Sequence, residues 1–89
     1  MIRRRVRIHN RLGLHARAAA RFVNASNRFQ CRVTVARGGR TVDGKSILGI
    51  LLLAASQGSD LEITADGVDE AAAIAFLADV VVGGFGEEA

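Results

Sequence analysis

The sequence predicts an α+β protein in which three helices pack on one side of a four-stranded antiparallel sheet. Segments with alternating apolar and polar residues are interleaved with segments of helical spacing in the order βαββαβα. The polar positions of the strands leave one sheet face solvated, whereas each helix has an apolar side that must be covered. A chain of 89 residues can bury one such core, so we expect a single domain spanning residues 1–89.

Four segments are expected to form the strands. In the first, which begins at Ile2, apolar residues alternate with arginines, although Arg4 interrupts the apolar side. Gly38-Gly39 predicts a hairpin turn between the second and third strands. The expected strands are Ile2–Ile8, Phe29–Arg37, Arg40–Asp43 and Asp60–Asp66.

Three segments are expected to be helical. The first covers Ala16–Ala25, and its core-facing positions are Ala16, Ala19, Ala20 and Val23, with Phe22 beside them. The second follows Ser46, a favourable N-cap residue, and covers Ile47–Ala55. The third has Asp69 and Glu70 in its first turn, runs to about Val82 and stops at Gly83-Gly84. The remaining segment, Phe85–Ala89, is expected to be a frayed acidic tail.

The composition excludes several classes of protein. No apolar run approaches the roughly 18 residues that span a membrane, and no apolar segment of a signal peptide follows the basic N-terminus. The one cysteine, Cys31, cannot form an internal disulfide, which fits a reducing cytoplasm. No group of Cys and His has metal-ligand spacing. We therefore expect a cytoplasmic protein without membrane insertion, metal or cofactor.

Charge is distributed unevenly along the chain. The first 45 residues hold all 12 Lys and Arg and one acid, Asp43, which gives a net charge of +11. The remaining 44 residues hold the other eight acids and no Lys or Arg. This asymmetry predicts a basic face and an acidic face, of which the basic face would attract acidic proteins, phosphates or nucleic acids.

The stretch Gly13-Leu14-His15-Ala16-Arg17-Ala18-Ala19 brings a histidine to the start of the first predicted helix. A helix that starts there directs free backbone N–H groups and the positive end of its dipole toward His15. A neutral imidazole can accept a phosphoryl group, and Arg17 could stabilise the transferring oxygens. We expect the N–H groups of Ala16, Arg17 and Ala18 to bind the phosphate. An isolated histidine would more often be a capping or surface residue.

Together with a second motif, this stretch resembles the HPr family of bacterial phosphotransferase systems, which includes the nitrogen-branch relative NPr. Gly13-Leu14-His15-Ala16-Arg17 looks like the active-site signature, and Val42-Asp43-Gly44-Lys45-Ser46-Ile47-Leu48-Gly49 looks like the regulatory-serine signature. The resemblance implies an open-faced β-sandwich with sheet order 1-4-2-3. It also implies a stoichiometric carrier, not an enzyme, that receives a phosphoryl group from enzyme I on Nδ1 of His15 and passes it to enzyme IIA domains.

The resemblance further implies a surface for docking these partners. The second helix is apolar all round, and a short helix on an open sheet buries only one side, so we place Ile50 and Leu53 in the core. The implied docking residues are apolar ones with a basic rim: Leu14, Ala20, Ile47, Leu48 and Leu51, rimmed by Arg17, Arg21 and Lys45.

Ser46 has two compatible interpretations. A serine before an apolar helix is typically an N-cap. In some HPr proteins this serine is phosphorylated by an HPr kinase/phosphorylase, and a phosphate there would add nearly two negative charges beside the docking surface.

One residue departs from the family pattern. A proline commonly follows the arginine, and here that residue is Ala18. Alanine gives the unfolded chain more freedom, which costs about 0.4–1 kcal/mol, but it restores an N–H group near the phosphate. We expect a working site with an altered phosphohistidine lifetime or transfer rate.

Three other functions fit the sequence less well than the carrier function. A regulatory docking protein controlled by Ser46 is disfavoured because relatives of that kind lack the active histidine. A small basic nucleic-acid-binding domain is disfavoured because the chain has four Phe and no Trp or Tyr for base stacking. A hydrolase is disfavoured because no carboxylate or second base lies near His15 in the sequence.

Overall fold

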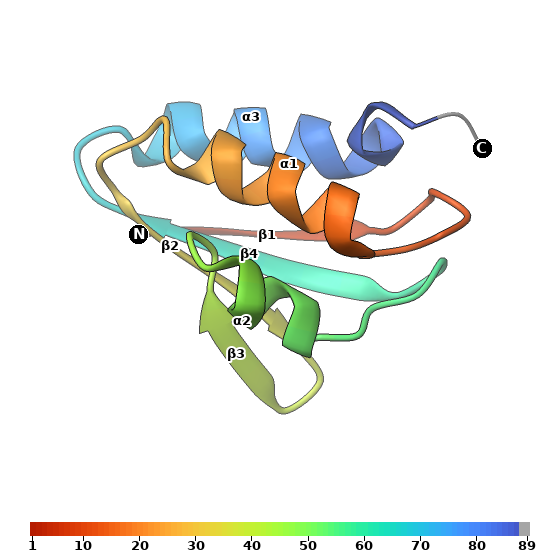
Figure 1. Ribbon diagram of the computed structural model, residues 1–89. Coiled ribbons are helices and arrows are strands. Elements are labelled where there is room, and N and C mark those ends of the chain that lie inside the picture. The colour runs from red at the N-terminus through yellow and green to blue at the C-terminus, as the bar shows by residue number, and fades with distance from the viewer. Residues whose placement is uncertain (88–89) are drawn as a thin grey trace.

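The computed structural model describes residues 1–87 and has the element order predicted from the sequence (Figure 1). The strands are β1 (Ile2–Arg7), β2 (Arg32–Arg37), β3 (Arg40–Asp43) and β4 (Asp60–Asp66). The helices are α1 (Ala16–Ser26), α2 (Ile47–Leu52) and α3 (Glu70–Val82), followed by the 3₁₀ turn η1 (Gly84–Gly86).

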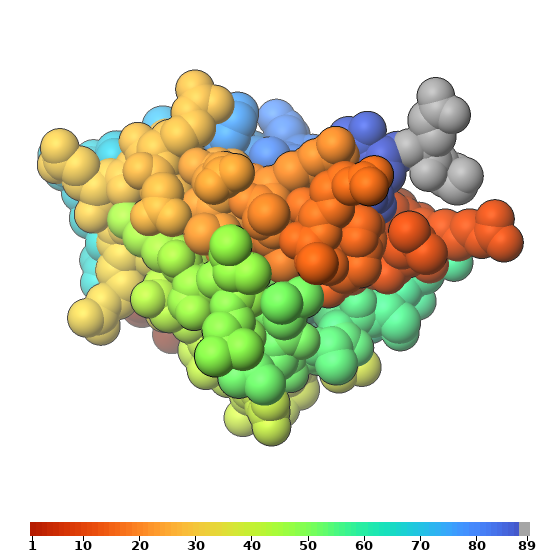
Figure 2. All heavy atoms as spheres, viewed as in Figure 1, coloured from red at the N-terminus to blue at the C-terminus, as the bar shows by residue number. Residues whose placement is uncertain are grey.

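The four strands form one antiparallel sheet in the order β1-β4-β2-β3, as the resemblance implies. The last strand therefore lies between β1 and β2, and Ala65 is paired with Ile2 on one side and Val33 on the other. The helices cover one face of the sheet, with α3 over β1 and β4 and with α1 between α3 and α2 (Figure 1). Figure 2 shows α1 and α2, in orange and green, side by side on one surface of the molecule.

The core between the two layers is aliphatic apart from two phenylalanines and Cys31. Its largest fully buried side chains come from both the sheet and the helices: Ile8, Phe22, Val33, Val35, Ile50, Leu61, Ile63, Ile74, Leu77 and Val81. Leu53 is also buried, which together with Ile50 confirms the two core positions predicted near the second helix.

The buried face of α1 differs from the predicted one. Ala19 and Val23 are buried as expected, but Ala16 is exposed, Ala20 is half-buried and Ala18 is fully buried. The face is rotated because Phe22, the bulkiest side chain of this helix, is inserted into the core, and Ala18 lies one turn before it.

Four element boundaries also differ from the prediction, one of them by the single residue Ser26 at the end of α1. β1 ends at Arg7, although Ile8 stays buried. β2 begins at Arg32 instead of Phe29, because the N–H groups of Gln30 and Cys31 donate to the Asp69 carboxylate at 2.8 and 2.9 Å and not to a neighbouring strand.

The second helix ends at Leu52, before the predicted Ala55. Ala54 adopts a left-handed conformation with φ of 48°. The guanidinium groups of Arg37 and Arg40 donate to the carbonyls of Leu53 and Leu52 at 3.2 and 3.1 Å, which satisfies acceptors that a longer helix would use internally.

The predicted frayed tail is wrong for residues 85–87. Phe85 is only 2% exposed, and Arg21 donates from Nη1 to its carbonyl oxygen. Glu87 is half-buried and makes two side-chain hydrogen bonds. The last two residues of that prediction lie outside the described residues.

The predicted separation into a basic and an acidic face is also wrong for the sheet. Since acidic β4 lies beside arginine-rich β1, Arg5 is opposite Glu62, and Arg7 forms an ion pair with Asp60 at 3.1 Å. The open face of the sheet thus carries both signs of charge, whereas α1 exposes Arg17, Arg21 and Arg28. Within residues 1–87, no helix is both long and apolar enough to cross a bilayer.

Candidate functional site

The loop before α1 is held firmly against the chain that leaves α2. The Leu14 N–H donates to the Ala55 carbonyl at 2.9 Å, and the Asn10 side chain donates from Nδ2 to the Gly13 carbonyl at 2.8 Å. Gly13 has a φ of +64°, a left-handed conformation that favours glycine. These contacts fix the position at which His15 begins the helix.

His15 is the N-cap residue of α1. Its backbone is extended, with φ of −76° and ψ of 178°, and its carbonyl accepts the Ala19 N–H at 2.9 Å. On the side chain, Nδ1 accepts the Arg17 N–H at 3.3 Å. A ring nitrogen that accepts carries no proton, so Nδ1 presents its lone pair to the start of the helix.

One of the expected anion-binding groups, the Arg17 N–H, contacts this nitrogen. Among the described residues, the N–H groups of Ala16 and Ala18 have no hydrogen-bond partner. Ala16, Arg17 and Ala18 were predicted to bind the phosphate through their N–H groups. Ala16 and Arg17 are exposed residues, whereas Ala18 is fully buried. The Arg17 side chain is exposed and forms no ion pair within residues 1–87.

A carboxylate that sequence reasoning missed lies on the other side of the ring. Glu87 bonds through Oε2 to His15 Nε2 and accepts the Asn10 Nδ2 group on Oε1 at 2.8 Å. Burial favours a higher pKa for Glu87, but the hydrogen bonds from Asn10 and His15 outweigh it and lower the pKa below its ordinary value. No local pattern identifies Glu87, because 72 positions separate it from His15.

The predicted docking residues do not all lie at the surface. Ile47 and Leu48 are 46% and 69% exposed, and Leu51 and Ala20 are half-buried. Leu14 is only 5% exposed, so its side chain belongs to the core and not to a docking surface, because the loop is drawn against α2.

Two basic residues of the predicted rim have partners within the chain. Lys45 donates from Nζ to the Phe29 carbonyl at 2.7 Å, and Arg21 is bound to the turn η1. Leu52, which the sequence did not single out, adds a further exposed apolar side chain next to Leu48 on α2.

Ser46 caps α2 as predicted, since its Oγ accepts the Gly49 N–H at 3.1 Å. The preceding turn is closed by Asp43, whose Oδ1 accepts the Lys45 N–H at 2.9 Å. The Ser46 side chain is half-buried and directly precedes the exposed Ile47 and Leu48.

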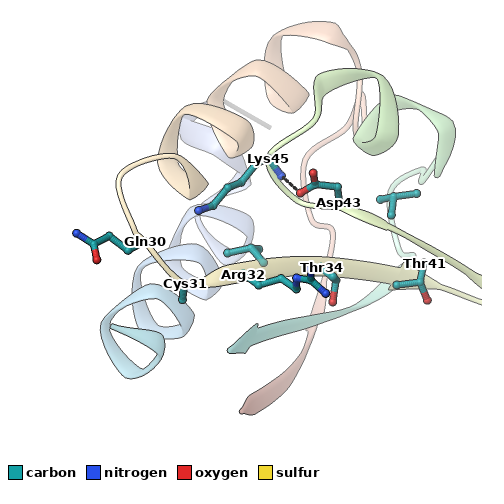
Figure 3. Close-up of a pocket in the computed structure, with 9 residues that line it drawn as sticks. Gln30, Cys31, Arg32, Thr34, Thr41, Asp43 and Lys45 are labelled. Carbon is teal, nitrogen blue, oxygen red and sulfur yellow. Dashed lines mark hydrogen bonds between the residues drawn. The ribbon is translucent and has the colours of Figure 1, made fainter. Parts of the chain in front are cut away.

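A separate depression of about 540 Å³ lies at the junction of β2 and β3 (Figure 3), and His15 is not among the residues that line it. Gln30, Arg32, Thr34, Thr41 and Lys45 line it from different elements. In Figure 3 these side chains point in different directions and do not converge on one point. No group of three or more potential metal ligands occurs within residues 1–87.

The chain is similar to known proteins over nearly its full length. The family model of the PTS HPr component phosphorylation site matches residues 2–82. The chain is 42% identical over 87 residues to phosphocarrier protein HPr of Neisseria meningitidis, with 98% of each chain covered. It is 41% identical over 88 residues to that of Xylella fastidiosa, with 99% of each covered. The crystal structure of HPr from Thermoanaerobacter tengcongensis matches with a TM-score of 0.95, 40% identity and 100% of both chains covered.

Proposed function

The chain belongs to the HPr family of phosphocarrier proteins of the phosphotransferase system, and we propose that it carries the phosphoryl group on Nδ1 of His15. One observation carries this proposal. Nδ1 faces the N-terminus of α1 as an acceptor, whereas Nε2 faces a carboxylate and therefore holds the proton of the ring. The nitrogen with the free electron pair is thus the one beside the anion-binding groups.

The transfer requires no water and no proton exchange at the reacting nitrogen. The lone pair of Nδ1 forms the N–P bond while the bond between phosphorus and the donor breaks, and its electron pair leaves with the donor. The Arg17 N–H, which bonds Nδ1 in the free protein, can then donate to a phosphoryl oxygen. The N–H of Ala16, an exposed residue, and the Arg17 guanidinium supply further positive charge.

The partners of the carrier are enzyme I as donor and enzyme IIA domains as acceptors, in the cytoplasm and without a cofactor. The exposed apolar surface formed by Ile47, Leu48 and Leu52 supports docking beside the site. The exposed arginines of α1 favour partners with an acidic rim. Because both transfers occur at the same histidine, the protein acts stoichiometrically and catalyses no net reaction alone.

Phosphorylation in the presence of enzyme I and phosphoenolpyruvate tests the assignment. The wild type should acquire phosphate that is labile in acid and stable in base, and His15→Ala should acquire none. His9→Ala is the matched control, because His9 is an exposed histidine in the same loop. Equal labelling of His15→Ala and wild type would show that another residue accepts the phosphoryl group.

Regulation through Ser46 is a second candidate role. Its half-buried hydroxyl lies at the start of α2, immediately before the exposed Ile47 and Leu48. A phosphate there would place negative charge at the edge of the docking surface and weaken binding of an acidic partner. Incubation with an HPr kinase/phosphorylase and ATP should label wild type and not Ser46→Ala.

A further inference from the structure

The C-terminal turn returns the chain to the start of α1, at the same end of the molecule (Figure 1). Phe85 anchors this turn: its side chain is buried although its φ of 57° is unfavourable for a residue other than glycine. The bond from Arg21 to the Phe85 carbonyl ties the turn to α1. The burial of Phe85 thus places Glu87 beside His15.

Glu87 is matched to its two donors. Asn10 is 3% exposed and uses Nδ2 for both the Gly13 carbonyl and Oε1 of Glu87, each at 2.8 Å. The second oxygen of Glu87 bonds His15 Nε2. Asn10 Nδ2 and His15 Nε2 are therefore each bonded to one of the two carboxylate oxygens of Glu87. A carboxylate satisfies both, whereas an amide could accept from one and would direct its own N–H group at the other.

We propose that Glu87, held by Asn10, is a positioning residue that keeps the His15 proton on Nε2 and so leaves Nδ1 as the nucleophile. This inference rests on the proposed function, because it concerns the nitrogen that attacks. Glu87 acts through His15 and does not touch the phosphoryl group.

The same contact assists the chemical step. When the Nδ1 lone pair forms the N–P bond, the ring keeps its Nε2 proton and becomes positively charged, and the electron pair of the broken bond leaves with the donor. The Glu87 carboxylate lies next to the nitrogen that shares this charge. No proton has to leave the ring during the transfer.

The first test measures the His15 tautomer directly by ¹⁵N NMR at about pH 8.5, where a free imidazole is neutral. Wild type should show one dominant form protonated at Nε2. Glu87→Ala should show a mixture of both tautomers, and Glu87→Gln an intermediate distribution, since glutamine keeps one acceptor. Glu62→Gln is the matched control, because Glu62 lies on β4 among the sheet residues opposite Arg5.

The second test measures the initial rate of phosphoryl acceptance from enzyme I. Glu87→Ala should be about tenfold slower than Glu62→Gln, by analogy with the smallest losses seen when a metal-bound histidine loses its outer hydrogen-bond partner. Unchanged ring shifts and an unchanged rate in Glu87→Ala would overturn the inference. The tautomer measurement needs no phosphorylation, so it remains decisive if His15→Ala labels normally and the proposed function fails.

Discussion

Gly13 lies so close to Ala55 that a Cβ atom added to it would come within 2.4 Å of the Ala55 carbonyl oxygen. The same oxygen accepts the N–H group of Leu14 at 2.9 Å. This contact joins the loop that carries His15 to the segment that leaves α2. The loop that carries His15 and the end of α2 are therefore positioned by one short backbone contact.

Gly13→Ala should lower the free energy of unfolding by more than about 2 kcal/mol. The left-handed conformation alone costs about 1–2 kcal/mol for alanine, and the overlap with Ala55 adds to it. Gly38→Ala is the control, because Gly38 has a similar φ of +59° but no atom within 4 Å of an added Cβ. Equal losses in urea unfolding would contradict the close contact.

Removing the cap of α2 should destabilise the protein. Ser46→Ala leaves the Gly49 N–H without its acceptor and should cost about 1 kcal/mol in thermal or urea unfolding. Ser46→Asp keeps an acceptor and adds a favourable charge at the helix N-terminus, so it should unfold near the wild-type midpoint. A loss in Ser46→Asp as large as in Ser46→Ala would rule out capping as the cause.

Restoring the proline typical of the family should stabilise the chain. Ala18→Pro removes an N–H that has no partner among the described residues and restricts the unfolded chain, which should raise the free energy of unfolding by about 0.4–1 kcal/mol. Ala20→Pro, inside the same helix, should instead lose about 3 kcal/mol. A loss of stability in Ala18→Pro would show that the buried position has no space for the ring.

Stability should fall in acid partly through Asp69. The pKa of Asp69 is lowered below its ordinary value, first by the hydrogen bond from the Gln30 N–H and also by the one from the Cys31 N–H. Desolvation opposes this effect but does not outweigh it. The folded state therefore binds this proton less readily, so the contribution is complete above the unfolded pKa of about 3.8 and is lost as pH falls through the lower folded pKa.

Asp69→Asn should consequently reduce the slope of the unfolding free energy between about pH 4 and pH 2, and should be less stable than wild type at neutral pH. Asp79→Asn provides the comparison on the same helix, since the exposed Asp79 side chain makes no hydrogen bond with the described residues. Parallel pH profiles for Asp69→Asn and wild type would argue against the linkage.

Docking should depend on the exposed apolar residues of α2. Leu48→Ala removes a side chain that is 69% exposed, so it should leave folding intact and weaken binding to enzyme I about fivefold. Val68→Ala is the matched control, because Val68 is 90% exposed before α3, outside this surface. Calorimetric titration should separate the two variants, and equal affinities would place the docking surface elsewhere.

The element order could be predicted because each element carries its own local pattern. Alternation over Asp60–Asp66 and the cap at Ser46 identify a strand and a helix without knowledge of their neighbours. The prediction failed where a distant residue decides the structure. The start of β2 is shifted because Gln30 and Cys31 bind Asp69.

Only some residues of the candidate site could be identified from a local sequence pattern. His15 and Arg17 could be identified because the start of a helix, a histidine and an arginine are adjacent in the sequence. Glu87 could not, because only the burial of Phe85 brings it back to the first helix. Leu14 was predicted to be a docking residue but is buried. Its burial results from the packing of the loop against Ala55, and sequence periodicity does not predict that packing.

The insertion of β4 between the first two strands has a consequence for biosynthesis. Among the four described strands β1 is made first, yet β4, its partner within residues 1–87, ends at Asp66. Residues 8–59 must therefore be made before the first strand can pair with its neighbour. While β1 is unpaired, its four arginines give it a positive charge, which disfavours its association with other incomplete chains.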